Sequence, residues 1–261
     1  MPEGDTIHRT ATSLAAVLVD RVVRRLASNI PLVSHARLVG KTITAVDAHG
    51  KNLFIRFDDG RVLHSHMQMT GSWHLYRPGE KWQRPAQLAR CVIEVEGAVA
   101  VCFSAPVLRV LSAPALARDD RLNALGPDIL GESFDAPRAI VRMRKEPERA
   151  IGDAVLEQRF VAGIGNIYKS ESLFRAQVDP FAPVGSLDDA TLERILNEAR
   201  KLMRANLHGA MRPTVSGAGE RYWVYRRSRR PCRRCGTRIE MKRQGALARS
   251  TYWCPRCQKP R

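Results

Sequence analysis

The spacing of hydrophobic and polar residues changes along the chain. Over residues 5–19, the apolar side chains Ile7, Leu14 and Leu18 fall on one helical face, and Thr6 or Asp5 is available to cap the first turn. From about residue 20 to residue 112, short β-type runs replace this period, separated by Gly, Asp and Pro. They predict strands at residues 42–46, 53–57, 61–66, 72–76, 91–95 and 99–103. One helix followed by many short strands favours a β-sandwich or barrel.

A helical period returns in the second half of the chain, at about residues 137–144, 149–161, 166–175 and 188–206. Before it, the polar stretch around Leu125-Gly126-Pro127-Asp128 has the composition of a linker. We therefore expect an α+β multidomain protein: a β-sandwich domain at 1–120, a linker at 121–135, a helical domain at 136–224 and a terminal module at 225–261.

Two Cys-x-x-Cys pairs end the chain, Cys232 with Cys235 and Cys254 with Cys257, and the 18 residues between them fit a four-thiolate zinc site on a small β-hairpin. Four protein ligands leave no coordination position for water or substrate, so we expect one structural Zn²⁺ and no catalytic metal. Two disulfides are the alternative. The sequence shows no signal peptide, and Cys91 and Cys102 sit alone in apolar stretches, which favours a reducing cytoplasm.

Positive charge is concentrated in the terminal module. The 261 residues carry a formal net charge of +17, and residues 226–261 hold 13 basic side chains against one acidic side chain. The run Arg226-Arg227-Ser228-Arg229-Arg230 has the character of a polyanion-binding stripe, because arginine binds phosphate in a bidentate manner. A merely solvated basic tail is the alternative. No apolar run approaches the length of a membrane span.

Two further segments suggest chemistry. In Gly163-Ile164-Gly165-Asn166, backbone N–H groups at a helix start could bind one phosphate, helped by Asn166 and Arg159, although an ordinary turn between helices has the same composition. At the start of the chain, removal of Met1 would expose Pro2 as a secondary amine at the positive end of a helix, with the Glu3 carboxylate beside it. Many proteins begin with Met-Pro for no catalytic reason.

Taken together, these segments resemble the formamidopyrimidine-DNA glycosylase and endonuclease VIII family of base-excision repair enzymes, nearly from end to end. The resemblance is carried by Pro2-Glu3-Gly4, Gly50-Lys51-Asn52-Leu53, His66-Met67-Gln68-Met69-Thr70-Gly71, Leu125-Gly126-Pro127-Asp128, Gly163-Ile164-Gly165-Asn166-Ile167-Tyr168 and the cysteine module with Arg249-Ser250-Thr251. It implies a catalytic domain at 1–120, a helix-two-turn-helix domain at 136–224 and a zinc ribbon at 225–261.

The resemblance also implies roles for single residues. Pro2 is expected to attack C1′ of the damaged nucleoside, displacing the base and forming a Schiff base, while Glu3 serves as acid and base. Lys51 and Arg249 are expected to contact phosphates at the lesion and to assist strand cleavage, and Asn166 to bind phosphate. Gln68, Met69 and Thr70 correspond to the loop that fills the gap left by an extruded nucleotide. For Met69, ordinary packing at a strand end is the alternative.

The chain departs from its relatives at three places. Thr6 stands where many carry a second glutamate. Ala124 stands where endonuclease VIII relatives can carry an arginine, with Arg121 three residues earlier. The stretch between Met211 and Val224 is shorter than the lid of the purine-excising branch. His64 and His66 alternate along one strand, and we do not expect them to bind metal, because no further ligand stands at a suitable spacing.

We therefore expect a monomeric, cytoplasmic DNA glycosylase and AP lyase, associated with the nucleoid if bacterial, that acts on damaged double-stranded DNA without a membrane. It is expected to favour oxidised pyrimidines and to cleave the strand by β,δ-elimination. A purine-directed formamidopyrimidine or 8-oxoguanine glycosylase is one alternative. A non-enzymatic protein that binds damaged DNA is the other, although such a protein has no need for Pro2, Glu3 and Lys51 together.

Overall fold

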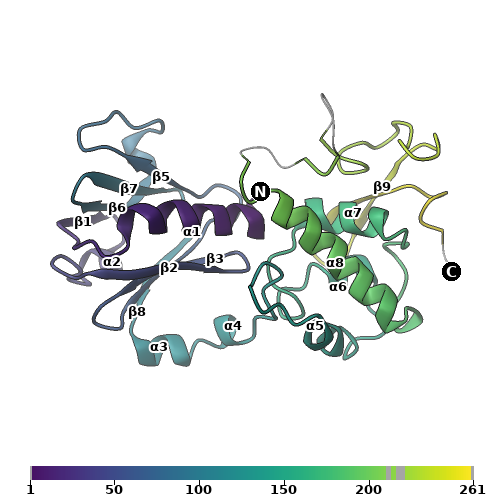
Figure 1. The fold of residues 1–261 in the computed structure, drawn as a ribbon, viewed down its shortest axis with the longest axis horizontal. Helices are drawn as coiled ribbons and strands as arrows, with labels where there is room; N and C mark the ends of the chain where they lie inside the picture. Colours follow the sequence, from purple (N-terminus) through teal and green to yellow (C-terminus); the bar gives the residue numbers. More distant parts are fainter. Residues whose placement is uncertain (1, 210–212, 216–220, 260–261) are drawn as a thin grey trace. The chain divides into compact units, whose positions relative to one another are not determined.

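The computed structural model describes residues 2–209, 213–215 and 221–259, so Met1 lies outside the described residues. The chain divides into two compact units, Met1–Ala124 and Leu125–Arg261. Within the described ranges, no helix has both the length and the apolar character that crossing a membrane requires. Figure 1 shows the elements of both units in chain order.

The first unit is a sandwich of two antiparallel four-stranded sheets. One sheet has the order β1 (Arg25–Ser28), β6 (Ala89–Val95), β7 (Ala98–Phe103) and β5 (Ser72–Tyr76). The other has the order β2 (Ile43–His49), β3 (Asn52–Phe57), β4 (Val62–His66) and β8 (Val107–Leu111). Residues of both sheets, among them Ile55, Leu63, Ile93 and Ala100, share one buried core. The predicted β-sandwich is confirmed.

Helix α1 (Gly4–Leu18) lies along the sandwich beside β2 (Figure 1). Its apolar stripe, Ile7, Leu14 and Leu18, is buried as the pattern predicts. The predicted cap was wrong: the helix begins at Gly4, and Glu3 occupies the N-cap position with extended backbone. Glu3 therefore precedes the helix, and its backbone carbonyl accepts the amides of Thr6 and Ile7.

Strands β1 and β8 were not predicted, and both lie at sheet edges. The runs predicted as strands are otherwise present with small shifts of their ends. Register places Cys91 opposite Cys102, and both are buried free thiols. Burial raises the pKa of both thiols, that of Cys91 to about 12, so neither is poised as a nucleophile.

Between the sandwich and the second unit, the chain forms two short helices, α3 (Ala113–Ala117) and α4 (Asp120–Asn123). Ser112 and Asp119 cap them, each accepting a hydrogen bond from the backbone N–H of the third helical residue. Unit 1 also contains the helical turns α2 (Pro31–Ser34) and η1 (Ala86–Leu88). The predicted linker, residues 121–135, thus begins inside α4.

The second unit packs helices around a core that includes Ile140, Val161, Tyr168 and Leu196. Its helical elements are α5 (Ala136–Met143), α6 (Ile151–Ala154), α7 (Asn166–Arg175), η2 (Val184–Ser186) and α8 (Asp189–Ala205). The prediction of a helix at 149–161 was wrong, since only the turn α6 forms. Gly126 donates its backbone N–H to Gln158 O, and Asp128 bridges to Ala162 in parallel, so the later part of this segment pairs with the chain at 126–128.

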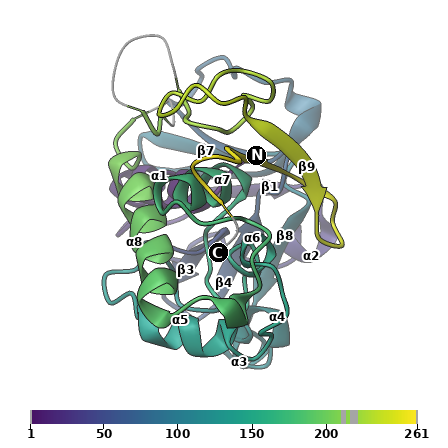
Figure 2. The same cartoon turned by 90° about the vertical axis from the view of Figure 1, so that its right-hand side faces the viewer.

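A hairpin of β9 (Glu240–Gln244) and β10 (Arg249–Trp253) lies beside α7, as Figure 2 shows. One cysteine pair precedes β9 and the other follows β10. The α+β architecture with a terminal hairpin module therefore agrees with the expectation.

Candidate active site and metal centre

The start of α1 holds the expected nucleophile and its acid. Pro2 is half-buried, whereas Glu3 and Asp5 are 1% and 0% exposed. The Thr6 hydroxyl donates a long hydrogen bond of 3.5 Å to Asp5 Oδ1. Thr6 thus directs a hydroxyl at a neighbouring buried carboxylate. The positive end of the 15-residue helix lies at Glu3 and disfavours a protonated amine there.

Lys51 lies in a two-residue hairpin turn between β2 and β3. His49 pairs with Asn52 across the turn, and Gly50 adopts φ 59°. A positive φ at the first turn position suits a residue without Cβ and is typical of a type II′ hairpin. Burial, followed by the nearby charge of Lys51, lowers the pKa of His66, which lies opposite Asn52 on β4. His66 therefore lies within electrostatic range of Lys51.

The segment Gln68-Met69-Thr70 forms a tight turn that hydrogen bonds hold in place. Gly71 N donates to Met67 O at 2.8 Å, and Thr70 Oγ1 donates to Ser104 O at 3.0 Å. A Cβ on Gly71 would lie 2.7 Å from the backbone of Met67, so this turn requires glycine. Gln68 N donates to His66 Nδ1 at 3.2 Å, which connects the turn to β4.

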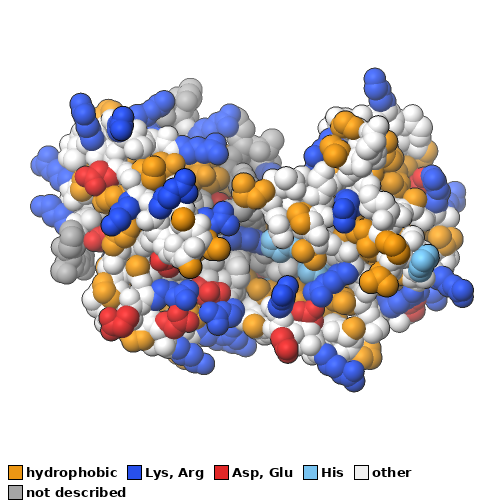
Figure 3. Space-filling view, turned by 180° about the vertical axis from the view of Figure 1, so that it is seen from behind, with side chains coloured by type: hydrophobic (Ala, Val, Ile, Leu, Met, Phe, Trp, Pro, Cys, Tyr) orange, Lys and Arg blue, Asp and Glu red, His pale blue; other side chains and the backbone are white. Residues whose placement is uncertain are grey.

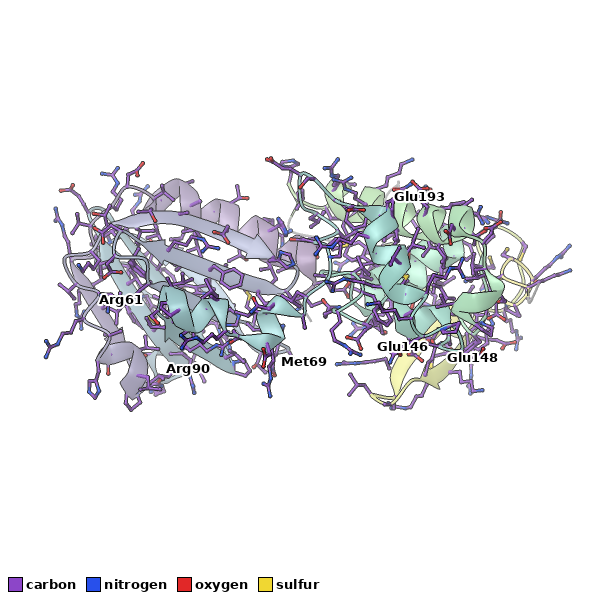
Figure 4. All side chains as sticks on the ribbon, turned by 90° about the horizontal axis from the view of Figure 1, so that it is seen from below. Arg61, Met69, Arg90, Glu146, Glu148 and Glu193 are labelled. Carbon is purple, nitrogen blue, oxygen red and sulfur yellow. The ribbon has the colours of Figure 1, made fainter. Side chains whose placement is uncertain are left out.

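Met69 extends away from the strands at the tip of that turn, and it is 67% exposed (Figure 4). Met67, two residues earlier, is buried in the sandwich core. Ordinary packing, the alternative considered for Met69, is therefore not what the structure shows.

His64 is the most strongly perturbed histidine of this unit. Its Nε2 lies 2.9 Å from Asn52 Oδ1, and its Nδ1 accepts Arg109 Nε at 3.1 Å. Burial and then the charges of Arg109 and His66 lower the pKa of His64 to about 4, against a smaller opposing effect of Asp119. Among the described residues, His64 and His66 belong to no group of three or more side chains that could hold a metal ion.

This lowered pKa predicts a loss of stability in acid. A histidine with a folded-state pKa near 4 and an unfolded value of 6.5 contributes stability that is complete above pH 6.5 and is lost as pH falls toward 4. The loss should reach about 3 kcal/mol in the free energy of unfolding. Hydrogen exchange of β3 amides at pH 7 and pH 4 measures it. We expect the difference between wild type and His64→Phe to shrink by that amount, whereas parallel pH curves would contradict the assignment.

In the second unit, the Leu-Gly-Pro-Asp motif docks the chain onto the segment before Asn166. A Cβ on Gly126 would lie 2.3 Å from Phe160 O, so only glycine allows this approach. Gln158 then organises the following turn: its Oε1 accepts Gly163 N at 3.0 Å, and its Nε2 donates to Ile164 O at 3.1 Å. No motif or spacing in the sequence indicates this role of Gln158.

The two predicted phosphate ligands of this region have protein partners in the structure. Arg159 pairs with Glu157 at 3.2 Å and with Glu146 at 3.7 Å, although its side chain is 56% exposed. These carboxylates raise its pKa, so it stays cationic. Asn166 begins α7, and its Nδ2 donates to Ser250 O at 2.8 Å. The buried Oδ1 of Asn166 has no hydrogen-bond partner among the described residues.

Two charged residues inside α7, Lys169 and Glu171, are fully buried, and neither was predicted to matter. Lys169 Nζ donates to Thr251 Oγ1 at 2.7 Å and joins Asn166 in holding β10. The Glu171 carboxylate accepts the Thr214 hydroxyl and the backbone amides of residues 223–225 at 2.8–2.9 Å. Burial raises the pKa of Glu171, and these four donors oppose the shift.

Glu171 therefore anchors described residues within the stretch between Met211 and Val224, namely Thr214 on one side and the backbone from Trp223 on the other. Positions 211, 212 and 216–220 of that stretch lie outside the described residues.

Arg249 begins β10 and lines a hollow of about 320 Å³ together with Arg149, Asp153 and Glu157. Arginine and lysine side chains are spread over the surface that Figure 3 shows, with fewer acidic ones. Within the predicted basic stripe, Arg226, Arg229 and Arg230 are exposed, but Arg227 is only 7% exposed. Arg227 donates to Trp223 O and Pro231 O and therefore has a structural role, so the exposed stripe is interrupted at this position.

The four cysteines Cys232, Cys235, Cys254 and Cys257 converge, with all sulfur atoms within 4.8 Å of one another. Their closest pairs lie 3.5 Å and 3.9 Å apart, far beyond a disulfide bond, and all are free thiols. Zinc–sulfur bonds of about 2.3 Å in a tetrahedron imply sulfur separations of about 3.8 Å. The cluster thus fits one structural Zn²⁺, as predicted, and the disulfide alternative is excluded. Phe174, Val224 and Ile239 surround it.

Comparison with known proteins agrees with this architecture. The formamidopyrimidine-DNA glycosylase N-terminal domain matches residues 1–106, its H2TH domain residues 125–216, and the zinc finger found in FPG and IleRS residues 230–260. The chain therefore belongs to the formamidopyrimidine-DNA glycosylase and endonuclease VIII family of DNA-repair enzymes. The resemblance of its motifs is confirmed, and so is the fold class.

Individual relatives match along nearly their whole length. The chain is 40% identical to a probable endonuclease 8 2 of Streptomyces coelicolor, over 99% of this chain and 94% of that protein. It is 36% identical to the DNA-(apurinic or apyrimidinic site) lyase Nei2 of Mycolicibacterium smegmatis, over 99% of both. A Lactococcus lactis formamidopyrimidine-DNA glycosylase, solved with DNA that contains an AP site, has a TM-score of 0.82 at 21% identity. The alignment covers 99% of this chain and 100% of that one, and this likeness concerns the fold alone.

Proposed function

We propose that the protein removes oxidised bases from double-stranded DNA, with pyrimidines favoured, and then cleaves the strand at the resulting abasic site. One observation carries the proposal: Pro2 directly precedes Glu3, which is 1% exposed at the start of a 15-residue helix. A buried carboxylate beside the first amine of a helix is unnecessary for binding DNA. It suits an amine nucleophile that needs a proton donor and acceptor.

The chemistry follows from these two groups once Met1 has been removed. The Pro2 nitrogen attacks C1′, the glycosidic bond breaks, and the base departs with the bonding electrons and a proton. Glu3 moves the protons that open the sugar ring and leave an iminium between Pro2 and C1′. Loss of a C2′ proton then expels the 3′-phosphate, and a second elimination expels the 5′-phosphate. Water finally hydrolyses the Schiff base and frees Pro2.

Phosphate contacts on each unit would hold the DNA. Lys51 lies in a short hairpin turn of the first unit, and its ammonium group would bind a phosphate next to the lesion. In the second unit, Asn166, Arg159 and Arg249 would bind phosphates, and β10, which carries Arg249, is held to α7 by Asn166 and Lys169. Met69, exposed on its pinned turn, would fill the space of the extruded nucleotide, with Gln68 and Thr70 beside it.

The partner is thus damaged duplex DNA, and we propose that a monomer acts in the cytoplasm. Cleavage of a duplex with one preformed abasic site tests the function. Wild-type protein should nick the damaged strand and leave phosphates at both ends of the gap, whereas the undamaged duplex stays intact. Tight binding without any nick, by protein with a free Pro2, would instead favour a damage-binding protein.

Lesion choice is the next prediction. Glu171 anchors a stretch that leaves few residues between Thr214 and Trp223 to close over a wide purine, so contacts that would hold its edge are missing. We expect single-turnover excision of thymine glycol or dihydrouracil to exceed that of 8-oxoguanine opposite cytosine by about tenfold or more. Otherwise identical duplexes serve as controls. Faster excision of 8-oxoguanine would place the chain in the purine-directed branch.

A further inference from the structure

A chain of polar side chains crosses the first unit on one face of the sheet β2-β3-β4-β8. Asn52, His64 and Arg109 come from the adjacent strands β3, β4 and β8, and His64 lies directly opposite Arg109. Asn52 and His64 are 7% and 3% exposed. This face is not part of the sandwich core, whose residues on β3 and β4 are Leu53, Ile55, Phe57 and Leu63.

The donor and acceptor chemistry of the three side chains fixes the direction of each hydrogen bond between them. Arg109 Nε carries a hydrogen and donates to His64 Nδ1 at 3.1 Å, so the proton of a neutral His64 resides on Nε2. That N–H donates to Asn52 Oδ1 at 2.9 Å, which orients the Asn52 amide. The amide then donates from Nδ2 to His49 O at 3.3 Å.

At the far end of this hydrogen-bonded series, Arg109 is also held in place. Arg109 Nη2 lies 2.6 Å from Asp119 Oδ2, and Asp119 caps α4 through the Leu122 amide. The Asp119 side chain is 11% exposed, so this ion pair is shielded from solvent more than most surface pairs are. Arg109 is therefore oriented from a helix end outside the sheet.

At the other end of the hydrogen-bonded series, Asn52 adjoins the turn that carries Lys51. His49 and Asn52 are paired on either side of Gly50 and Lys51, so a bond from the Asn52 side chain to His49 O spans the turn itself. We propose that Asn52, His64 and Arg109 are positioning residues that set the conformation of this turn and thereby the reach of Lys51. The inference rests on the proposed function of Lys51 in strand cleavage.

His64 acts here through geometry and not through proton transfer. It is buried, and its ring also stacks on Phe54 at 5.1 Å between centroids. Burial lowers its pKa, so the ring remains neutral at physiological pH and keeps one donor and one acceptor nitrogen. Displacing a reacting group by about 1 Å can slow a reaction by about 100-fold, so a loosened turn should affect the rate more than the affinity.

The decisive variant is His64→Phe, which keeps a stacked ring and removes both nitrogens. We expect cleavage of a preformed abasic site under single-turnover conditions to slow by about tenfold or more. Affinity for a duplex with a tetrahydrofuran abasic analogue should change by less than about twofold, because few phosphate contacts are lost. His64→Gln, whose amide can still donate to Asn52, should recover part of the rate.

His74→Phe is the matched control. His74 lies on β5 in the other sheet, its ring nitrogens lie 3.0 Å from Ser72 Oγ and 3.1 Å from Tyr76 Oη, and its ring stacks on Tyr76. The same substitution there removes a comparable pair of hydrogen bonds without contact to the Lys51 turn. An equal loss of cleavage rate in both variants would overturn the proposal, because the effect would then be general destabilisation.

A double-mutant cycle with Lys51→Ala separates the remaining outcomes. If His64 acts through Lys51, the double variant cleaves no more slowly than Lys51→Ala alone. If the loss of cleavage rate in the double variant is instead the product of the two single losses, His64 acts independently of Lys51, and the inference is overturned. An unaltered cleavage rate in the His64→Phe protein would also overturn it. Unimpaired cleavage by Lys51→Ala would also overturn it while leaving the proposed function intact, whereas an inactive wild type would refute the proposed function itself.

Discussion

Protein that retains Met1 is expected to form no borohydride-stable complex with abasic-site DNA and to lose strand cleavage by on the order of 10³-fold, because an amide nitrogen at Pro2 cannot attack C1′. Pro2→Gly, which offers a primary amine at the same place, should keep part of the trapping. Intact mass of each preparation establishes whether Met1 is present. Equal trapping by the Met1-bearing form would show that a lysine is the nucleophile.

Glu3→Gln separates the carboxylate from the amine. The amide has nearly the same shape but cannot transfer protons, so base excision should fall by about 10²–10⁴-fold while lesion DNA still binds. Because Glu3 is 1% exposed, a thermal unfolding midpoint close to that of wild type is required as a control.

Loss of the metal is the second change with a large expected effect. Removing zinc, or replacing Cys254 with Ser, should unfold the module around the cysteine cluster, since a structural zinc site contributes about 10–16 kcal/mol to the folding of a small module. The hairpin strand β10, held to α7 by Asn166 and Lys169, would be released together with Arg249. DNA affinity should therefore fall by about tenfold or more.

The sandwich should survive this treatment, because it belongs to a separate compact unit with its own core. Hydrogen exchange of β3 and β4 amides measures this directly, and zinc content is obtained by metal analysis. Cys91→Ala is the matched control, as Cys91 is buried in the sandwich core and should leave the zinc content unchanged. Active protein without zinc, or full binding after complete chelation, would contradict the assignment.

The elements that the sequence predicted best are those whose signal is local. The predicted strands of the sandwich, α7, α8 and the cysteine cluster each follow from a period or a spacing within a few residues. The missed strands β1 and β8 bury almost none of their side chains fully, so neither has a clear alternation of buried and exposed positions. The false helix at 149–161 has helical spacing at Ile151, Ala154 and Val155, but distant pairing at Gly126 and Asp128 directs its later part elsewhere.

The candidate site divides in the same way. Pro2, Glu3, Lys51 and the zinc cysteines stand in recognisable short motifs. The residues that support them do not, because their partners are distant in sequence: His64 meets Arg109 45 positions away, and Lys169 meets Thr251 82 positions away. In the sequence, a lysine or glutamate in α7 looks like an ordinary exposed residue of a helix, because its buried partners are not known. For Arg227, composition predicted phosphate binding, but its guanidinium donates hydrogen bonds to two backbone carbonyls of the protein.

The most direct test of the central claim is to locate the covalent bond. Wild-type protein is incubated with abasic-site duplex and borohydride, the complex is digested with protease and nuclease, and the modified peptide is sequenced by mass spectrometry. We predict that the reduced sugar adduct lies on the nitrogen of Pro2, in a peptide that begins Pro2-Glu3-Gly4. An adduct on Lys51 or on any other lysine, with Pro2 free and unmodified, would contradict the account.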